Sequence, residues 1–454
     1  MSNNHNRMEA KVVRDCRELS VPKRALLSFQ HVFAMFGATI LVPILTGIDI
    51  STALFMAGAG TLFFHWITKG RVPAFLGSSF AFIAGYNAIT HFNAATGGVA
   101  DPALLSKAHG GVVCAGLVYL VFGFFIRIYG AKRVMRFFPP VVTGPIIISI
   151  GLILAPVAIQ SCSTDWLIAL IAIGTIIFFN IWGRGMTKII PIMLGGIVAS
   201  LAALLLNRGF TFDALQNVPF IKIPLDPRYF ATFDFSAIIT IVPISIATMM
   251  EHIGDISAIG ATTGENYIEN PGLHRTLVGD GLATSLSAFF GGPANTTYGE
   301  NTGVLVLTKV YDPRLVRYAA CVSILLSVFP GIAAVIYGIP ASVIGGISLV
   351  LYGMISAIGI RNMVENQVDL TLSRNLLIAA GILVSALGFN SVGGLSFAIG
   401  QTTLTLSGLA VAALVGIVLN IVLPGKDFDF EEERQEHVVD FSGITEKGFK
   451  EEVM

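Results

Sequence analysis

Long apolar runs, separated by charged or Gly/Pro-rich breaks, recur from one end of the sequence to the other. Only 12% of the 454 residues are charged, about half the share that a soluble domain carries. One globular core could not hide so much apolar chain, so lipid must solvate it in spans of roughly 20 residues. We therefore predict an all-α polytopic membrane protein with about 14 transmembrane segments. The predicted spans are 26–48, 51–68, 73–90, 110–130, 140–158, 165–183 and 188–206, then 236–260, 275–291, 294–308, 315–338, 340–359, 375–392 and 402–424.

The basic residues set the orientation of these spans. With the N-terminus placed in the cytoplasm, all but four of the 28 Lys and Arg residues fall on the cytoplasmic side, as the positive-inside rule requires. We therefore expect a multi-pass protein of the cell (plasma) membrane with both termini cytoplasmic. Residues 1–25 form the N-terminal segment and residues 425–454 the tail. A formal net charge of +0 gives no sign of a nucleic-acid partner. The four exceptions are Lys107, Arg208, Lys222 and Arg228.

The spans divide into two halves of seven, 26–206 and 236–424, joined by an extracytoplasmic connection at 207–235. An odd number of spans per half requires the halves to insert with opposite orientation, so we predict two inverted seven-span repeats. Paired residues support the repeat, because Gln30-His31 and Glu251-His252 both lie in the first span of their half.

The third span of each half is interrupted. Small polar residues, an aromatic residue and glycine replace the apolar run at 77–80 and at 295–299. Lipid tolerates such backbone only where protein buries it or where it lines a cavity. A broken helix also aims the free N–H groups of its half-helix N-terminus at whatever fills the gap. The two interruptions therefore predict a binding site for a small polar molecule.

Four carboxylates lie in predicted spans of the second half, and three of them, Glu251, Asp255 and Glu300, are candidates for the site. Ionisable groups inside a membrane are expensive and are functional candidates by default. Glu251 and Asp255 are four positions apart and share one helix face. A structural network holding the broken helices together is the alternative interpretation. Asp280 is expected to be structural.

Two histidines lie in the first spans of the two predicted halves. His31 and His252 could carry protons, and a hydrogen-bonded packing role is the alternative for each.

The donors and acceptors of such a site define its ligand. An ionised carboxylate only accepts hydrogen bonds and an exposed backbone N–H only donates them. A cyclic imide or amide, such as a pyrimidine or purine base, satisfies both. Phe80 and Tyr298 offer aromatic faces to a flat ring.

At these residues the chain resembles the nucleobase/ascorbate transporter (nucleobase–cation symporter) family, and within it the bacterial uracil permeases. The similarity runs from Leu27 to Pro424. It is carried by SFQHVFAMFG at 28–37, LGSSFAF at 76–82, EHIGD at 251–255, PGLHR at 271–275 and NTTYGENTG at 295–303. The resemblance implies that broken spans 3 and 10 carry short strand-like segments that meet at the substrate. It also implies a core of spans 1–4 and 8–11 and a gate of the remaining spans.

The resemblance also implies roles for single residues. Glu251 and Glu300 would hydrogen-bond the base, the backbone amides of Phe80 and Gly299 would bind its carbonyls, and Tyr298 would lie beside the ring. The residues expected to shape the site or to couple it to protons are Gln30, His31, His252, Asp255 and Asn301.

One position departs from the uracil permeases, which commonly have His where this chain has Asp255. Aspartate there is more similar to the purine-transporting branch, whereas Glu300 is similar to the pyrimidine carriers. Because Glu300 is expected to touch the ring, uracil is the first candidate substrate. Xanthine, uric acid or another purine base is the alternative.

These features predict secondary active import of uracil by proton symport, with alternating access between core and gate. Glu251 and Asp255 could share a proton, and sodium is the alternative coupling ion because two carboxylates also suit a hard cation. No cofactor, resident metal or catalytic residue is expected.

Two rival functions fit the sequence poorly. An anion carrier would want a cation at the broken helices, where none stands. An intramembrane hydrolase would need a zinc or paired-aspartate motif, and the Gly-Asp pairs at 254–255 and 279–280 lack the preceding glycine of such a motif.

The family resemblance also implies a homodimer formed through the gate domains. Small residues in spans five and twelve allow close helix packing of this kind: Gly144, Gly151, Gly345 and Gly346.

Overall fold

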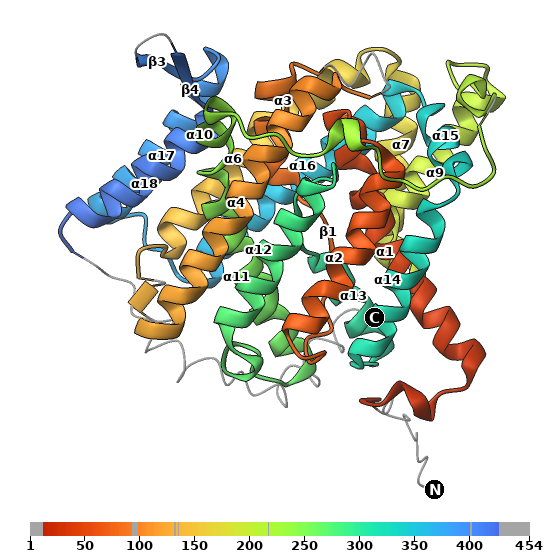
Figure 1. Cartoon of the computed structure of the whole chain (residues 1–454), viewed down its shortest axis with the longest axis horizontal. Coiled ribbons are helices and arrows are strands. Elements are labelled where there is room, and N and C mark those ends of the chain that lie inside the picture. The colour runs from red at the N-terminus through yellow and green to blue at the C-terminus, as the bar shows by residue number, and fades with distance from the viewer. Residues whose placement is uncertain are drawn as a thin grey trace, which may run out of the picture.

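The computed structural model describes residues 12–92, 99–130, 133–134, 136–216, 218–399 and 402–425 (Figure 1). The predicted tail at 425–454 lies outside these residues except for its first position, as do residues 1–11 of the N-terminal segment. Helices make up most of the described chain, and two short β pairs accompany them.

The first half contains helices η1 (Cys16–Glu18), α1 (Val21–Thr46), α2 (Ile50–Ile67), η2 (Phe80–Phe82), α3 (Ile83–Thr90), α4 (Pro102–Tyr129), α6 (Pro140–Cys162), α7 (Trp166–Trp182), α8 (Met186–Ile189) and α9 (Pro191–Leu205), with strand β1 (Leu76–Ser78) before η2. The connection carries two short turns, η4 (Asp213–Leu215) and η5 (Pro227–Tyr229).

The second half contains helices α10 (Phe235–Ile241), α11 (Ile244–Thr263), the π-turn η6 (Ile268–Gly272), α12 (Leu273–Phe289), α13 (Gly299–Thr308), α14 (Pro313–Ser327), α15 (Pro330–Tyr337), α16 (Ala341–Glu365), α17 (Ser373–Ser391) and α18 (Gly408–Val422). Its strands are β2 (Asn295–Thr297), β3 (Leu395–Ile399) and β4 (Thr402–Leu406).

Polar caps start many of these helices where the apolar runs begin. The Asp49 carboxylate accepts a hydrogen bond from the amide of Thr52 at 2.8 Å, ahead of α2. Asp101 and Asp312 each cap a helix that continues with proline, which has no N–H to satisfy at that position. α2 and α14 thus begin within two residues of the predicted spans at 51 and 315, whereas α4 begins at Pro102, ahead of the predicted start at 110.

Membrane spans are supported by length and composition. Within the described residues, seven helices are long and apolar enough to cross a membrane, or eight if α14 and α15, bent by 76°, count as one span. Every predicted span coincides with at least one helix, and several of those helices are short because the span is interrupted. The chain is a multi-pass membrane protein, and the larger number of spans stays a prediction.

The expectation of an all-α fold was wrong in one respect, at the last predicted span (402–424). Its first five residues form β4, which pairs antiparallel with β3, and α18 begins only at Gly408. The segment Thr402–Leu406 is rich in threonine, whose branched Cβ favours a strand. The Ser407 side chain then accepts a hydrogen bond from the Ala410 amide at 3.2 Å and starts the helix.

Helix contacts in one half have counterparts in the other. α2 packs on α14, and α12 packs on α4. Likewise α7 contacts both α9 and α16, while α17 contacts both α18 and α6. When each predicted span is replaced by the span seven places away, the α2–α14 contact becomes the α12–α4 contact. In the same way, the two contacts of α7 become the two contacts of α17. Two such spans, α6 and α16, contact each other directly.

The α6–α16 contact uses the small residues expected to allow dimer packing. A Cβ at Gly151 would lie 3.1 Å from the Ser356 amide nitrogen, and one at Gly345 would lie 2.5 Å from the Cys162 amide nitrogen. These glycines therefore serve packing within the chain.

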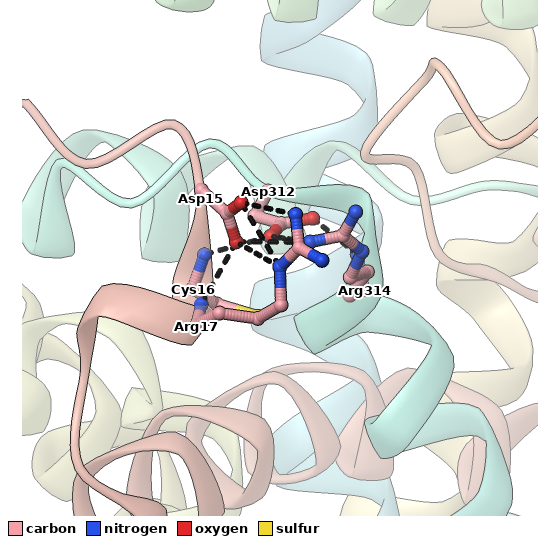
Figure 2. A network of polar contacts seen from close by, with 5 residues as sticks. All are labelled: Asp15, Cys16, Arg17, Asp312 and Arg314. Atoms are coloured by element: carbon pink, nitrogen blue, oxygen red, sulfur yellow. Dashed lines mark hydrogen bonds and ion pairs between the residues drawn. The ribbon is translucent and has the colours of Figure 1, made fainter.

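The N-terminal segment docks onto the linker between α13 and α14 (Figure 2). Val13 forms a parallel bridge with Val310, and the Cys16 amide donates to Asp312 Oδ2 at 2.7 Å. Arg314 Nη1 donates to Asp15 Oδ1 at 2.9 Å. The start of α1 is thereby fixed to the start of α14.

Candidate functional site

The two predicted interruptions meet as a two-stranded ladder. Strands β1 and β2 pair antiparallel, with Leu76 opposite Thr297, Gly77 opposite Thr296 and Ser78 opposite Asn295. All six residues are buried. The expectation of short strands in spans 3 and 10 is therefore confirmed, and Figure 1 shows β1 in the middle of the molecule.

Hydrogen bonds with neighbouring helices engage both the backbone and the side chains of the ladder. The Leu76 amide donates to Thr61 Oγ1 at 2.9 Å, and Asn295 Nδ2 donates to the Met56 carbonyl at 3.0 Å, both on α2. The Thr284 hydroxyl of α12 donates to the Asn295 carbonyl at 2.5 Å. Such hydrogen bonds allow backbone outside helices to be buried here, although Asn295 Oδ1 and Thr296 Oγ1 have no partner among the described residues.

A helix begins directly after each strand. η2 and α3 follow β1 from Phe80, and α13 follows β2 from Gly299. Neither N-cap side chain, Ser79 or Tyr298, accepts a hydrogen bond from the helix that it precedes. The first N–H groups of a helix have no partner within it, so both helix starts can offer amides to an anion or a carbonyl.

The three predicted carboxylates gather beside the start of α13. Glu251 and Asp255 lie on α11, Glu300 lies in the first turn of α13, and all three are half-buried. The charge of Asp255 interacts with those of Glu251 and Glu300. A Cβ built on Gly299 would lie 3.1 Å from Asp255 Oδ1, so glycine lets the carboxylate approach the backbone. The sequence-predicted acids therefore form one cluster.

Open space adjoins this cluster. Gly254 and Gly299 are exposed, and a Cβ on Gly254 would meet no atom within 4 Å. Phe80 and Gln30 are half-buried, and Gln30 Oε1 has no hydrogen-bond partner among the described residues. No packed side chain covers the backbone at Gly254, between Glu251 and Asp255.

Tyr298 fixes the two strands to each other. Its hydroxyl donates to the Ser78 carbonyl at 3.0 Å and accepts from Thr39 Oγ1 at 3.2 Å. The ring packs over Gly77, where a Cβ would lie 2.5 Å from Tyr298 Cζ. Tyr298 is only 3% exposed, so the protein holds both its hydroxyl and its ring.

Two further predicted residues hold α13 and β2 in place. Asn301 Nδ2 lies 3.2 Å from His31 Nδ1 and donates to the His31 carbonyl at 3.1 Å, which ties α13 to α1. His252 Nδ1 lies 2.9 Å from Thr297 Oγ1 and 3.5 Å from Asp280 Oδ1. Both histidines therefore have polar contacts inside the protein.

Asp280 has a partner that its sequence context did not reveal. It lies on α12, fully buried, between His252 of α11 and Thr297 of β2. No spacing rule connects positions 252 and 280, because the pairing depends on how α11 packs against α12.

One other cluster has the residue types of a metal site. Ligand atoms of Asp15, Cys16 and Asp312 lie within 4.8 Å of one another. Arginines already occupy both carboxylates, since Arg17 and Arg314 bind Asp15 and the Arg314 amide donates to Asp312 (Figure 2). Burial, helped by the hydrogen bond to Asp312, raises the pKa of the Cys16 thiol to about 11. Because arginine side chains already contact both carboxylates, the cluster serves as a docking contact.

Comparison with known proteins shows the family of the chain. A family model described as "Permease family" matches residues 22–394. The chain belongs to the nucleobase/ascorbate transporter family. It is therefore a membrane transporter and not an enzyme.

Among relatives in this family, a uracil permease of Bacillus caldolyticus is 39% identical over 432 residues, covering 91% of this chain and 95% of the relative. A probable uracil permease of Pasteurella multocida is 37% identical over 424 residues, covering 91% and 96%. A putative pyrimidine permease of Escherichia coli is 38% identical over 432 residues, covering 93% and 94%.

Solved structures share the fold at low identity. The transmembrane domain of the cyanobacterial bicarbonate transporter BicA superimposes with a TM-score of 0.60 at 15% identity, covering 90% of this chain and all of that domain. SLC26A9 superimposes with a TM-score of 0.62 at 11% identity, covering 90% of this chain and 66% of that chain.

Proposed function

We propose that this transporter imports uracil by proton symport. The observation that carries the proposal is the cluster of three half-buried carboxylates beside two interrupted spans whose strands pair. Such a cluster offers acceptors from side chains and donors from helix starts, which is the complement of a cyclic imide. Two relatives of near-full coverage are named uracil permeases, probable in one case.

The substrate would lie between α11, α13 and the start of η2. Glu251 and Glu300 would accept hydrogen bonds from the ring N–H groups, and the amides of Phe80 and Gly299 would donate to the ring carbonyls. Phe80 and Tyr298 would flank the ring. Asp255 is the residue that favours the alternative substrate, a purine base such as xanthine or uric acid.

The coupling ion would occupy the Glu251–Asp255 pair. The two carboxylates lie one turn apart on α11 and interact electrostatically, so one proton shared between them would remove the charge that opposes closure around the substrate. Sodium is the alternative, since paired carboxylates also suit a hard cation.

Alternating access would arise from motion of the core (spans 1–4 and 8–11) against the gate (spans 5–7 and 12–14). The exchange pattern of helix contacts supports two inverted seven-span repeats and 14 spans in all. Both termini would then lie in the cytoplasm and the protein in the plasma membrane, where the family resemblance suggests a homodimer through the gates.

An anion carrier of the same fold is the nearest rival, since one solved neighbour is named a bicarbonate transporter. The described site sets three acids beside the helix starts and contributes no Lys or Arg. An anionic substrate would be repelled there, whereas a neutral base would not.

Uptake of labelled uracil into proteoliposomes tests the proposal. Vesicles with an inward proton gradient and no sodium should accumulate label, and excess unlabelled uracil should block accumulation while xanthine should not. Accumulation that requires sodium would reject proton coupling. Uptake of xanthine in place of uracil would make Asp255 the better guide to the substrate.

A further inference from the structure

A polar cleft of about 590 Å³ lies outside the carboxylate site, and none of the predicted site residues lines it. Its walls come from the N-terminal segment, the turn between α2 and β1, the turn between α11 and α12, and the start of α14. By the predicted orientation all four lie on the cytoplasmic side. Its five basic lining residues are Arg14, Lys69, Arg71, Arg314 and Arg317.

The acids of the cleft are already engaged. Its three acidic lining residues are Asp15, Glu265 and Asp312. Arg14 pairs with Glu265, and Arg314 lies 2.9 Å from Asp15 Oδ1 and 3.6 Å from Asp312 Oδ2 (Figure 2). Arg17, outside the lining, holds the pKa of Asp15 well below its usual range, so that carboxylate stays charged at neutral pH.

Three cations remain without an ion pair among the described residues: Lys69, Arg71 and Arg317. Lys69 and Arg71 are exposed, and Arg317 is half-buried. The Arg317 guanidinium rests against Gly70, in the turn between the other two, and a Cβ at Gly70 would overlap Arg317 Nη1. The turn and α14 therefore hold the three positive charges around one space.

We infer that this cleft binds a phosphate-bearing anion of about nucleotide size. A guanidinium binds phosphate oxygens through two parallel N–H donors, and two of the three unpaired cations are arginines. The volume lies within the range of sites that bury a small ligand. Tyr311 and Asn270 also line the cleft, so a ring and an amide stand beside the phosphate position.

The shared chemistry could come from a soluble phosphate ester or from a lipid headgroup. Binding to the full-length protein in nanodiscs separates them. In phosphatidylcholine nanodiscs, isothermal titration would use pyrophosphate and adenosine monophosphate as probes. In parallel, the melting temperature would be compared in nanodiscs with and without phosphatidylglycerol.

The test variants are Arg71→Gln, which changes an exposed side chain, and Arg317→Gln. Arg184→Gln is the matched control, because Arg184 is exposed, lies on the predicted cytoplasmic side and is absent from the cleft lining. We expect saturable probe binding that weakens about tenfold in each test variant and is unchanged in the control.

Stabilisation by phosphatidylglycerol that is lost in the same two variants, without probe binding, would assign the site to a lipid headgroup. Two results would overturn the inference. One is the absence of both probe binding and lipid stabilisation. The other is an equal loss in Arg184→Gln, which would show only a general attraction of anions to a basic face.

Discussion

Gly77→Ala tests whether the β1–β2 ladder positions the site. The new Cβ would lie 2.5 Å from Tyr298 Cζ and 2.8 Å from Thr39 Oγ1. Carbon atoms in contact normally stand about 3.5–4.0 Å apart. The tyrosine ring would therefore have to retreat by about 1 Å, or the strands would have to separate by that distance.

The ring has no room for such a retreat. Tyr298 is only 3% exposed, and its hydroxyl is bonded to Thr39 and to the Ser78 carbonyl. Overpacking of this kind costs about 1–3 kcal/mol, and leaving buried polar groups unpaired costs about 1–3 kcal/mol more. We expect a loss of about 2–6 kcal/mol in stability. We also expect weaker uracil binding, because the displaced ring or strands lie between the amides of Phe80 and Gly299.

The assay compares thermal melting and equilibrium binding of labelled uracil with those of Gly303→Ala. Gly303 lies in α13, and a Cβ there would meet no atom within 4 Å. Alanine inside a helix is favoured over glycine by about 0.5–1 kcal/mol, so the control should melt at or slightly above the wild-type temperature. Equal melting and equal affinity of the two variants would refute the positioning role of the ladder.

Three other perturbations have defined outcomes. Asp280→Asn should lower the melting temperature, at a cost of about 1–3 kcal/mol, because it weakens a buried contact with His252; an unchanged temperature would remove the structural role of Asp280. Asp312→Asn should expose Cys16 to maleimide in a variant whose other cysteines are serine, since the Cys16 amide loses its charged acceptor; equal labelling would show that docking does not depend on Asp312. In the same cysteine variant with Asp312 kept, labelling of Cys16 should rise only as the pH approaches 11, because the thiolate is the reactive form. An exposed thiol titrates near 9. A rise in labelling near pH 9 would contradict the burial of Cys16.

Local chemistry in the sequence predicted much of this molecule. The polar interruptions at 77–80 and 295–299 predicted where helix would give way to strand. The i, i+4 spacing of Glu251 and Asp255 predicted that they share a face. Burial in lipid leaves few choices for a backbone, so these patterns are informative.

Pairings between distant segments were not predictable in this way. Asp280 and His252 meet because α11 packs on α12, and the N-terminal segment reaches Asp312 across almost 300 positions of sequence. The β3–β4 hairpin was missed because an apolar, threonine-rich run satisfies the hydropathy of a span as well as the pattern of a strand. Hydropathy alone cannot separate the two.

Equilibrium binding of labelled uracil to the purified wild-type protein and to Glu300→Gln tests the central claim most directly. Glutamine keeps the size of the side chain and removes its charge, so a change in affinity reports the carboxylate as acceptor. We predict that labelled uracil binds saturably to the wild type and is displaced by unlabelled uracil and not by xanthine. We predict that Glu300→Gln loses this binding. Wild-type affinity in that variant would contradict the assignment of the carboxylate cluster as the substrate site.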